Sequence, residues 1–380
     1  MDLETIKKRE EKYYAHTFTR LPIAVIRGEG MYVYDVSGQK YLDMFAGIAV
    51  DSLGHAHPKV VEAISKQAGL LMHTSNWLYT LPQLELAELL SEITGLDRSF
   101  ITNDGTEAVE AAFKLARKTT GRKEVISMEG AFHGRTMGSL SLTSGEKYRK
   151  PFEPLVPETK SVPYNNIDEL KKAISSKTAA VIVEPIQGEA GVIIPDADYL
   201  KQVRELTEEK SVLLILDEVQ TGFGRTGEMF AYQHSGIEPD ILCLAKGMGS
   251  GFPIGVIVYS GGDFSPGEHG GTFVGNPLAC AVSKTVIETI RKDGLVENSK
   301  RMGDYLLKKL LASGAKARGR GLMIGVDEAN GEETVLELIG KGVLTIYSKN
   351  TVRILPPLII ERKHADEFLT AFGSLKKQDG

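Results

Sequence analysis

Between residues 100 and 260, short runs of apolar residues alternate with amphipathic stretches. Because the runs show no polar alternation, they are typical of strands that are buried on both faces of a sheet. The predicted strands are Phe100–Thr102, Val125–Ser127, Ala180–Val183, Val212–Leu216, Ile241–Leu244 and Val256–Tyr259, and the predicted helices between them are Glu107–Lys118, Ile167–Ile174 and Tyr199–Glu208. This alternation predicts an α/β fold in which helices cover a mostly parallel sheet.

The regions on either side of this stretch have different patterns. They predict a polar helix or arm at 1–20, a hairpin at 31–44, helices after Pro58 and at Leu84–Ile93, helices at Leu278–Arg291 and Glu297–Leu311, and strands at Gly321–Val326 and Val352–Ile354. We therefore expect two domains. The large one would comprise residues 51–281, and residues 1–50 and 282–380 would together form a small α+β domain.

The composition argues against several classes of function. The chain has 380 residues, with 45 Lys and Arg against 50 Asp and Glu, and its formal net charge is −5. Because there is no basic excess, nucleic acid is not an expected partner. Cys243 and Cys280 are too few for a disulfide framework and indicate a reducing compartment. The N-terminus lacks an apolar signal region and no apolar run reaches the ~20 residues of a membrane span, so we expect a cytoplasmic protein without a membrane partner.

Polar residues follow several of the predicted strands. They are the run Asn103-Asp104-Gly105-Thr106, Glu184, Asp217 and Lys246. Ligands of open α/β sheets bind beyond the carboxyl ends of the strands, where these residues are expected to lie. A carboxylate at the end of a buried strand needs a partner, so Asp217 is expected to meet a cation, a metal or a protonated ring nitrogen, or else backbone amides.

Lys246 lies between an apolar strand and a glycine-rich turn. The segment from Asp217 to Lys246 has room for one helix and one strand, which allows the two side chains to lie close together. Loss of water around the lysine amine would lower its pKa and make it a nucleophile toward carbonyls, while the alternative is a solvated lysine in a turn. Pyridoxal phosphate would suit this arrangement, because its aldehyde could meet Lys246, its ring nitrogen Asp217, and its phosphate the helix start at Gly105 and Thr106.

Longer motifs are spread over nearly the whole chain. They are RGEGMYVYDVSGQKYLDM, LGHAHP, NDGTEAVEAAFKLAR, FHGRT, VEPIQGEAGV, LDEVQTGFGRTG, AKGMGSGFPIG, TFVGNPLACA and VRILPPL. With these motifs the chain resembles the class III (ω-amino acid) aminotransferases of the fold type I pyridoxal-phosphate enzymes, and among them most the acetylornithine/ornithine group.

The resemblance implies that the large domain binds pyridoxal 5'-phosphate. Lys246 would form the internal aldimine and move a proton between substrate and cofactor, and Asp217 would keep the pyridine nitrogen protonated. The other implied cofactor-binding residues are Gly105 and Thr106 at the phosphate, Phe132 and Val219 on the two ring faces, Gln220 at the ring hydroxyl, and Glu218 in the same motif. Thr272 would reach the phosphate of the neighbouring subunit, so that a homodimer would share its active sites.

The resemblance also implies how substrates are held. Arg135 resembles the family arginine that binds the carboxylate of the amino donor, and Arg353 resembles the one that binds the α-carboxylate of glutamate. Glu189 would pair with Arg353 while the other substrate is bound. Taken singly, each arginine also fits a surface salt bridge.

Three positions depart from the family pattern. Gly271 stands where a serine often precedes the phosphate-binding threonine, and Val274 stands where a glycine often follows it. Phe18 stands where ornithine aminotransferases have a tyrosine that helps to bind substrate. Gly271 and Phe18 are therefore candidate substrate-binding residues, and the missing hydroxyl at Phe18 favours an acylated donor over free ornithine.

Three histidines need separate interpretation. His55 and His57 have the spacing of a metal pair, but no acidic cluster accompanies them, so we expect structural hydrogen bonds and no metal site. His133 is expected near the cofactor because it follows Phe132. A hydrolase with a metal bound by the first two histidines is the alternative.

The resemblance implies a ping-pong transaminase of arginine or lysine biosynthesis. It would move the terminal amino group of N-acetylornithine, or of a similar ω-amino donor, to 2-oxoglutarate, which gives a semialdehyde and glutamate. Alternatives with the same cofactor are an ornithine, γ-aminobutyrate or carrier-linked lysine aminotransferase, or an aminomutase. A pyridoxal-fold regulator that binds DNA would need an added domain, for which the ~20 residues before Leu21 leave no room.

Overall fold

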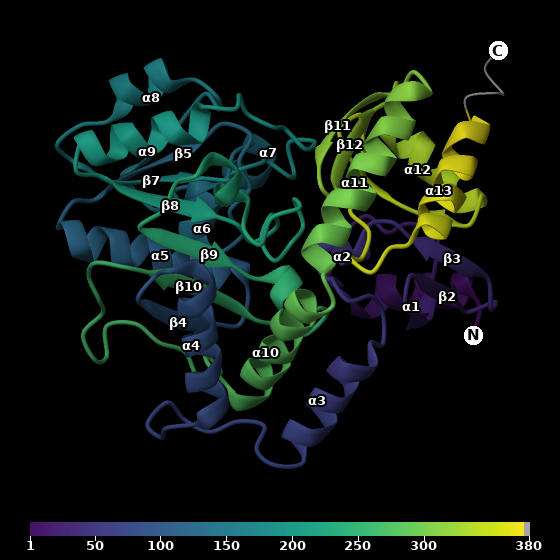
Figure 1. Cartoon of the computed structure of the whole chain (residues 1–380), viewed down its shortest axis with the longest axis horizontal. Coiled ribbons are helices and arrows are strands. Elements are labelled where there is room, and N and C mark those ends of the chain that lie inside the picture. The colour runs from purple at the N-terminus through teal and green to yellow at the C-terminus, as the bar shows by residue number, and fades with distance from the viewer. Residues whose placement is uncertain (376–380) are drawn as a thin grey trace.

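A seven-stranded sheet is the largest element of the computed structural model, which describes residues 1–375 (Figure 1). Its strands, in spatial order, are β4 (Arg98–Thr102), β10 (Gly255–Tyr259), β9 (Ile241–Leu244), β8 (Leu213–Asp217), β7 (Thr178–Val183), β5 (Glu124–Met128) and β6 (Thr159–Val162). Only β10 runs antiparallel to its neighbours, and the pairs from β9 to β6 are all parallel. The predicted α/β fold with a mostly parallel sheet is confirmed.

The two faces of this sheet bury separate apolar cores. Val183 and Leu216 pack on the side of α9, whereas Ile182 and Ile215 pack with the alanine-rich face of α5. The helices around the sheet are α5 (Gly105–Thr120), α6 (Met137–Leu142), α7 (Glu146–Arg149), α8 (Ile167–Ala173) and α9 (Tyr199–Glu209). Because neighbouring residues of a strand point to opposite faces, uninterrupted apolar strands supply both cores at once.

Two four-stranded sheets lie beside the large one. The first contains β1 (Val25–Glu29), β2 (Tyr32–Asp35), β3 (Lys40–Asp43) and β13 (Val343–Leu344), and the second contains β11 (Lys316–Arg320), β12 (Met323–Asp327), β15 (Thr351–Ile354) and β14 (Ile346–Ser348). Leu42 of β3 pairs in parallel with Val343 of β13, so one short sheet joins segments from the two ends of the chain. The predicted domain boundaries near residues 50 and 281 stay a prediction.

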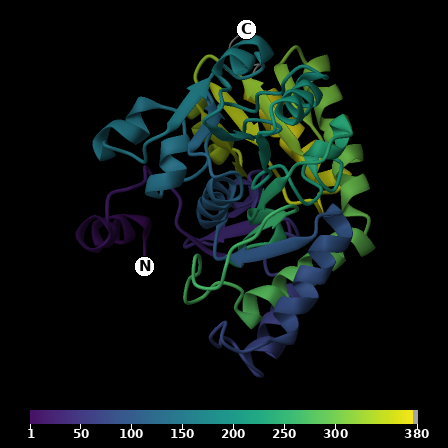
Figure 2. The ribbon, with the colours of Figure 1, turned by 90° about the vertical axis from the view of Figure 1, so that its left-hand side faces the viewer.

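The remaining helices connect these sheets or flank them. They are α1 (Leu3–Tyr13), α2 (Ala46–Ala49), α3 (Pro58–Ala68), α4 (Leu81–Thr94), α10 (Pro277–Lys292), α11 (Leu295–Ala312), α12 (Gly331–Gly340) and α13 (Arg362–Leu375). Figures 1 and 2 show α1 at the edge of the molecule, and none of its residues is buried. Within residues 1–375, no helix combines the length and apolarity that a membrane crossing requires.

The structure adds strands that the hydrophobic pattern did not predict. β6 and β11 are missing from the prediction because their sequences, TKSV and KARGR, are largely polar. The strand predicted at Gly321–Val326 begins only at Met323, because Gly321 has a φ of +54° and belongs to the turn of the hairpin between β11 and β12. The predicted hairpin at 31–44 and the helices after Pro58 and Pro277 are confirmed.

Gly303 of α11 gives a direct test of the packing against this hairpin turn. A Cβ at Gly303 would lie 2.0 Å from the carbonyl oxygen of Gly321, so we expect Gly303→Ala to destabilise the fold by roughly 2 kcal/mol. Gly373 of α13 has no atom within 4 Å of such a Cβ, and Gly373→Ala should stabilise by about 0.5–1 kcal/mol through helix propensity. Urea unfolding of both variants measures the difference, and equal stabilities would contradict the predicted clash.

Candidate active site

A cavity of about 450 Å³ opens at the carboxyl end of the large sheet. Its wall contains residues from the loops after five strands: Asn103, Asp104, Gly105 and Thr106 after β4, Phe132, His133, Gly134 and Arg135 after β5, Glu184 and Glu189 after β7, Asp217, Val219 and Gln220 at the end of β8, and Ala245 and Lys246 after β9. The structure thus brings together most of the candidate residues, as expected where the carboxyl ends of strands meet.

Asp217 is the last residue of β8 and is almost fully buried. Its Oδ1 accepts a hydrogen bond from the backbone N–H of Val219 at 3.0 Å, and its Oδ2 lies 2.7 Å from Nδ1 of His133. Burial lowers the pKa of His133, but the hydrogen bond to Asp217 and its negative charge outweigh this, so the pKa is raised. Asp217 therefore has one amide partner and one imidazole partner, and the histidine holds its carboxylate in a fixed orientation.

Lys246 begins a short 3₁₀ turn directly after β9 and has a φ of +44°. Its side chain is half-buried and lines the same cavity as Asp217. Burial lowers the pKa of Lys246, although the carboxylates of Glu189 and Asp217 oppose that effect. The geometry favours the desolvated lysine over the solvated turn lysine, and places an amine and an acid on one cavity.

Gly105 and Thr106 form the start of α5, which Asp104 caps by accepting a hydrogen bond from the N–H of Glu107 at 2.9 Å. A Cβ at Gly105 would lie 2.8 Å from Cγ1 of Val219, so only glycine fits here without displacing the valine. Free N–H groups at a helix start attract anions. This end of the cavity is therefore suited to a phosphate.

Arg353 in β15 is 1% exposed and forms a two-pronged ion pair with Glu189. Nη1 lies 2.6 Å from Oε1 and Nη2 lies 3.2 Å from Oε2. Burial raises the pKa of Glu189, but the charge and hydrogen bonds of Arg353 outweigh burial and lower it. Glu189 lines the cavity and Arg353 stands behind it, so the arginine is covered by its own carboxylate partner.

Arg135 lines the cavity and contacts two aromatic rings. Its guanidinium carbon is 4.0 Å from the ring centre of Tyr148 and 5.3 Å from that of Phe132. Cation–π contacts of this kind orient a guanidinium while its N–H groups stay available for a carboxylate. Of the two predicted arginines, Arg135 thus lines the cavity directly, and Arg353 is linked to it through Glu189.

Glu184 is a site residue to which sequence reasoning assigned no role. Its oxygens accept hydrogen bonds from the N–H groups of Phe132 at 2.8 Å and Gly188 at 3.3 Å. Burial raises the pKa of Glu184 to about 7. Its place after β7 was the available signal, but the contact between Asp217 and His133 had no signal beyond the neighbouring Phe132.

Besides Arg353, four candidate residues do not line this cavity within one chain. The carboxylate of Glu218 points away and accepts hydrogen bonds from the N–H groups of Ala231 and Tyr232, so its side chain does not support the predicted contact with the cofactor. Phe18 is 68% exposed in the arm after α1. Gly271 and Thr272 are exposed in the segment between β10 and α10.

Of the two LGHAHP histidines, only His55 forms the expected structural hydrogen bond, because Nδ1 of His57 is buried without a partner in the described part of the chain. Nε2 of His55 lies 2.7 Å from Oδ2 of Asp43, which confirms the expected structural hydrogen bond. Over residues 1–375, the structure contains no group of three or more His, Cys, Asp or Glu side chains arranged to hold a metal ion.

Comparisons with known proteins give concordant results. The family model "Aminotransferase class-III" matches residues 13–375. The acetylornithine aminotransferase of Archaeoglobus fulgidus is 50% identical over 364 residues, which cover 95% of this chain and 97% of that protein. The ornithine aminotransferase of Toxoplasma gondii, whose structure has pyridoxal phosphate at partial occupancy in its active site, aligns with a TM-score of 0.96 and 32% identity over 100% of this chain and 95% of that one. The acetylornithine aminotransferase of Elizabethkingia anophelis aligns with a TM-score of 0.89 and 32% identity over the whole of both chains.

Proposed function

The chain belongs to the class III aminotransferase family, and on that premise we propose that it transfers the terminal amino group of N-acetylornithine to 2-oxoglutarate. The enzyme is a transaminase and its cofactor is pyridoxal phosphate. Identity of 50% to an acetylornithine aminotransferase over nearly the full length of both chains carries the choice of donor. The products are a semialdehyde and glutamate, as in arginine or lysine biosynthesis.

The residues of the cavity fit this cofactor. Among residues 1–375, two buried polar atoms without a hydrogen-bond partner belong to side chains of the cavity wall, Oε1 of Gln220 and Nε2 of His133. Gly105 packs closely against Val219, next to the N–H groups at the start of α5. Gln220 would meet the ring hydroxyl, and Gly105 and Thr106 would hold the phosphate.

When bound, pyridoxal phosphate supplies an aldehyde for the amine and a ring that accepts negative charge from the substrate carbon. Asp217, held by His133, would keep the ring nitrogen protonated. Nζ of Lys246 would take up and return the proton of the substrate carbon, for which a lowered pKa is suitable. Phe132 and Val219 would cover the two faces of the ring and exclude water.

Two substrates that carry carboxylates can use one cavity because the carboxylate of Glu189 can pair with Arg353 when no substrate carboxylate does. Glu189 satisfies the guanidinium while the ω-amino donor is bound with its carboxylate at Arg135. When glutamate or 2-oxoglutarate binds, its α-carboxylate would take the place of Glu189, which has to move aside. An unpaired buried arginine would destabilise the fold. This exchange of carboxylates would keep Arg353 paired in both half-reactions.

Rates of the first half-reaction would test the proposed donor. We expect N-acetylornithine to convert the cofactor at least tenfold faster than ornithine, γ-aminobutyrate or a lysine derivative, measured by the change in cofactor absorbance. Lys246→Ala is the control, since it should abolish turnover and the yellow colour and leave the circular dichroism spectrum unchanged. A faster reaction with one of the other donors would refute the donor, and normal turnover in the variant would refute the site.

Arg353→Ala would test the exchange between Glu189 and substrate. We expect KM for 2-oxoglutarate or glutamate to rise at least tenfold, because a charge-assisted pair worth about 1.5–3 kcal/mol is lost. KM for the ω-amino donor should change much less. Steady-state kinetics with each substrate varied in turn measures both values, and equal effects would contradict the assignment of the two arginines.

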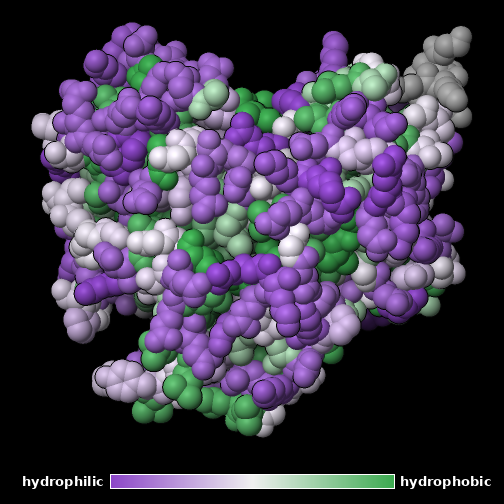
Figure 3. Space-filling view, viewed as in Figure 1, coloured by the Kyte–Doolittle hydropathy of each residue, from purple (hydrophilic) through white to green (hydrophobic). Residues whose placement is uncertain are grey.

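We also propose that two copies of the chain form a homodimer with shared active sites. The loop between α3 and α4 exposes Trp77 and Tyr79 almost completely, together with Leu78 and with Leu81 at the start of α4. Figure 3 shows hydrophobic residues at this lower end of the molecule. Exposed apolar clusters of this kind mark interfaces. Below, this cluster is called the α3–α4 ridge.

The segment that carries Thr272 contacts the same α3–α4 loop just before the ridge, at His73 and Asn76. The rings of Phe273 and His73 are 5.0 Å apart, and Nδ2 of Asn76 donates to the carbonyl of Val274 at 2.8 Å. A second copy that covers the ridge would therefore also cover this segment. That arrangement supports a role for Thr272 in the active site of the partner, although it does not reach the cavity of its own chain.

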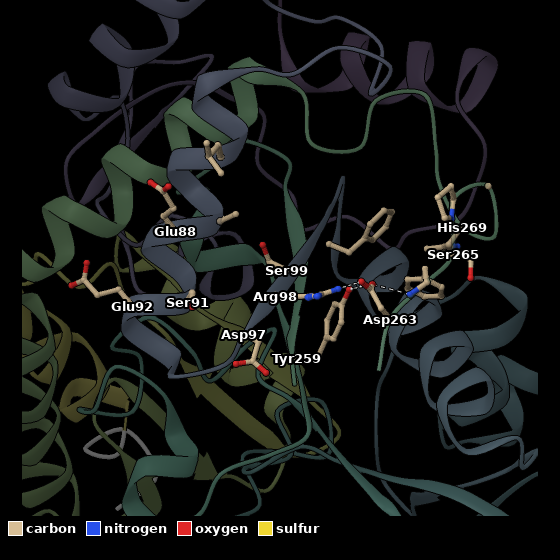
Figure 4. A pocket seen from close by; sticks show the side chains of 16 residues that line it. Glu88, Ser91, Glu92, Asp97, Arg98, Ser99, Tyr259, Asp263, Ser265 and His269 are labelled. Atoms are coloured by element: carbon tan, nitrogen blue, oxygen red, sulfur yellow. Dashed lines mark hydrogen bonds and ion pairs between the residues drawn. The ribbon is translucent and has the colours of Figure 1, made fainter. Parts of the chain in front are cut away.

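A larger cavity, of about 870 Å³, lies beside the ridge on the edge strand β4 (Figure 4). Figure 4 shows Arg98 and Tyr259 directed toward Asp263, with which both interact. Leu84 and Phe100 add apolar surface to its wall. Edge strands are seldom left uncovered, so this hollow is suited to side chains of the second copy.

Sedimentation velocity would test the dimer. We expect a single species of about twice the chain mass of 41.4 kDa for the natural chain. Tyr79→Asp should shift it toward monomer and weaken cofactor binding, because a charge would be buried in the interface. Leu336→Asp, at an exposed position on α12, should stay dimeric, and a monomeric natural chain would contradict the proposal.

A further inference from the structure

Next to Thr106 lies a compact hydroxyl network whose other members do not line the cavity and which the proposed reaction does not use. Oγ1 of Thr106 is 2.6 Å from Oγ of Ser139 and 3.0 Å from Oγ1 of Thr136. The backbone N–H of Thr136 also points to Oγ1 of Thr106, at 3.4 Å. Thr106 therefore has three polar neighbours in the segment that follows Arg135.

Glu110, one turn further along α5, holds this segment in place. Its Oε1 accepts hydrogen bonds from Oγ1 of Thr136 at 2.6 Å, from N of Gly138 at 2.8 Å and from N of Ser139 at 3.2 Å. One carboxylate oxygen thus fixes the backbone at 138–139 and one hydroxyl of the network. These three bonds join α5 to the start of α6.

Two glycines leave the space that the network needs. A Cβ at Gly134 would lie 2.1 Å from Oγ1 of Thr106, and a Cβ at Gly138 would lie 2.2 Å from Oε2 of Glu110. Gly134 has a φ of +131°, which other residues rarely adopt. Any side chain at either position would displace Thr106 or Glu110.

The contacts allow an arrangement in which Ser139 donates to Thr106 and not to Oγ1 or the carbonyl oxygen of Thr136, which lie 2.8 and 3.3 Å from its Oγ. This arrangement leaves the proton of Thr106 free for a ligand. An ionised carboxylate only accepts hydrogen bonds, so the hydroxyl proton of Thr136 goes to Glu110. The N–H of Thr136 and the hydroxyl of Ser139 can then both donate to Oγ1 of Thr106. In that arrangement every other proton has an acceptor, and the hydroxyl of Thr106 is oriented to donate into the cavity.

We propose that Glu110 is a positioning residue for phosphate binding: by holding Thr136 and Ser139, it orients the hydroxyl of Thr106 toward the phosphate group of the cofactor. The inference rests on the proposed role of Thr106. The negative charge of Glu110 is not part of the effect, since a second negative charge near a phosphate opposes binding. What matters is an acceptor oxygen at this place.

The affinities for pyridoxal phosphate and for pyridoxal, which lacks the phosphate, test this role. The full chain is freed of cofactor and titrated with each compound. The dissociation constant for pyridoxal divided by that for pyridoxal phosphate is the affinity ratio, and it reports how much the phosphate contributes to binding. Glu110→Ala should reduce this ratio about tenfold by weakening pyridoxal phosphate alone, as loss of about one charge-assisted hydrogen bond would. Glu110→Gln, whose amide oxygen can accept the same three bonds, should restore at least the natural ratio.

Further variants separate this role from simple stabilisation of α6. Thr136→Val removes one hydroxyl and keeps Glu110 as the acceptor for the two N–H groups, so it should lower the ratio two- to threefold even if Glu110→Ala does not fold. Glu62→Gln, at an exposed position on α3, is the matched control and should leave both affinities unchanged.

Three results would overturn the inference. They are an equal loss of affinity for both compounds in Glu110→Ala, a Glu110→Gln variant as impaired as Glu110→Ala, and a natural ratio in Thr136→Val. Thr106→Ala distinguishes this failure from that of the proposed function. If Thr106→Ala has the same ratio as the natural chain, Thr106 does not bind the phosphate at all. If Thr106→Ala lowers the ratio and Glu110→Ala does not, only the role of Glu110 is refuted.

Discussion

The hydrogen bond between Asp217 and His133 lies where the carboxyl ends of five strands meet, and the chemistry of the cavity depends on it. A carboxylate that is removed from water needs partners, and here one oxygen has an amide and the other an imidazole. Lys246 lies on the same cavity without a full shell of water. The fold thus places the carboxylate of Asp217 and the amine of Lys246 on one cavity wall, where a ligand can reach both.

The same principle applies to the other charged groups of the site. Arg353 is covered by Glu189, and Glu184 takes two backbone N–H groups and has a pKa raised to about 7 by burial. Each charge is paired without a ligand, although Nε of Arg353 is buried without a hydrogen-bond partner among residues 1–375. The parallel sheet makes this possible because its strand ends deliver side chains from distant segments to one edge.

Much of the fold follows from local pattern, and the site follows from it only in part. Apolar runs such as Ile241–Leu244 predicted the buried strands, while β6 and β11 escaped because pairing with neighbours, and not hydrophobicity, makes them strands. Glu218 was grouped with Asp217 by motif, but neighbouring residues at the end of a strand point in opposite directions. The network around Glu110 joins residues that are 26 or more positions apart in the chain, and no periodicity records such contacts.

The pairing of Leu42 with Val343 has a consequence for folding during synthesis on the ribosome. The N-terminal hairpin emerges about 300 residues before the strand that completes its sheet, and at roughly 5–20 residues per second that delay lasts some tens of seconds. During this delay the edge of β3 that faces away from β2 has no strand to pair with. This sheet is therefore completed only late in synthesis, and a nascent chain that ends before Val343 would leave the outer edge of β3 unpaired.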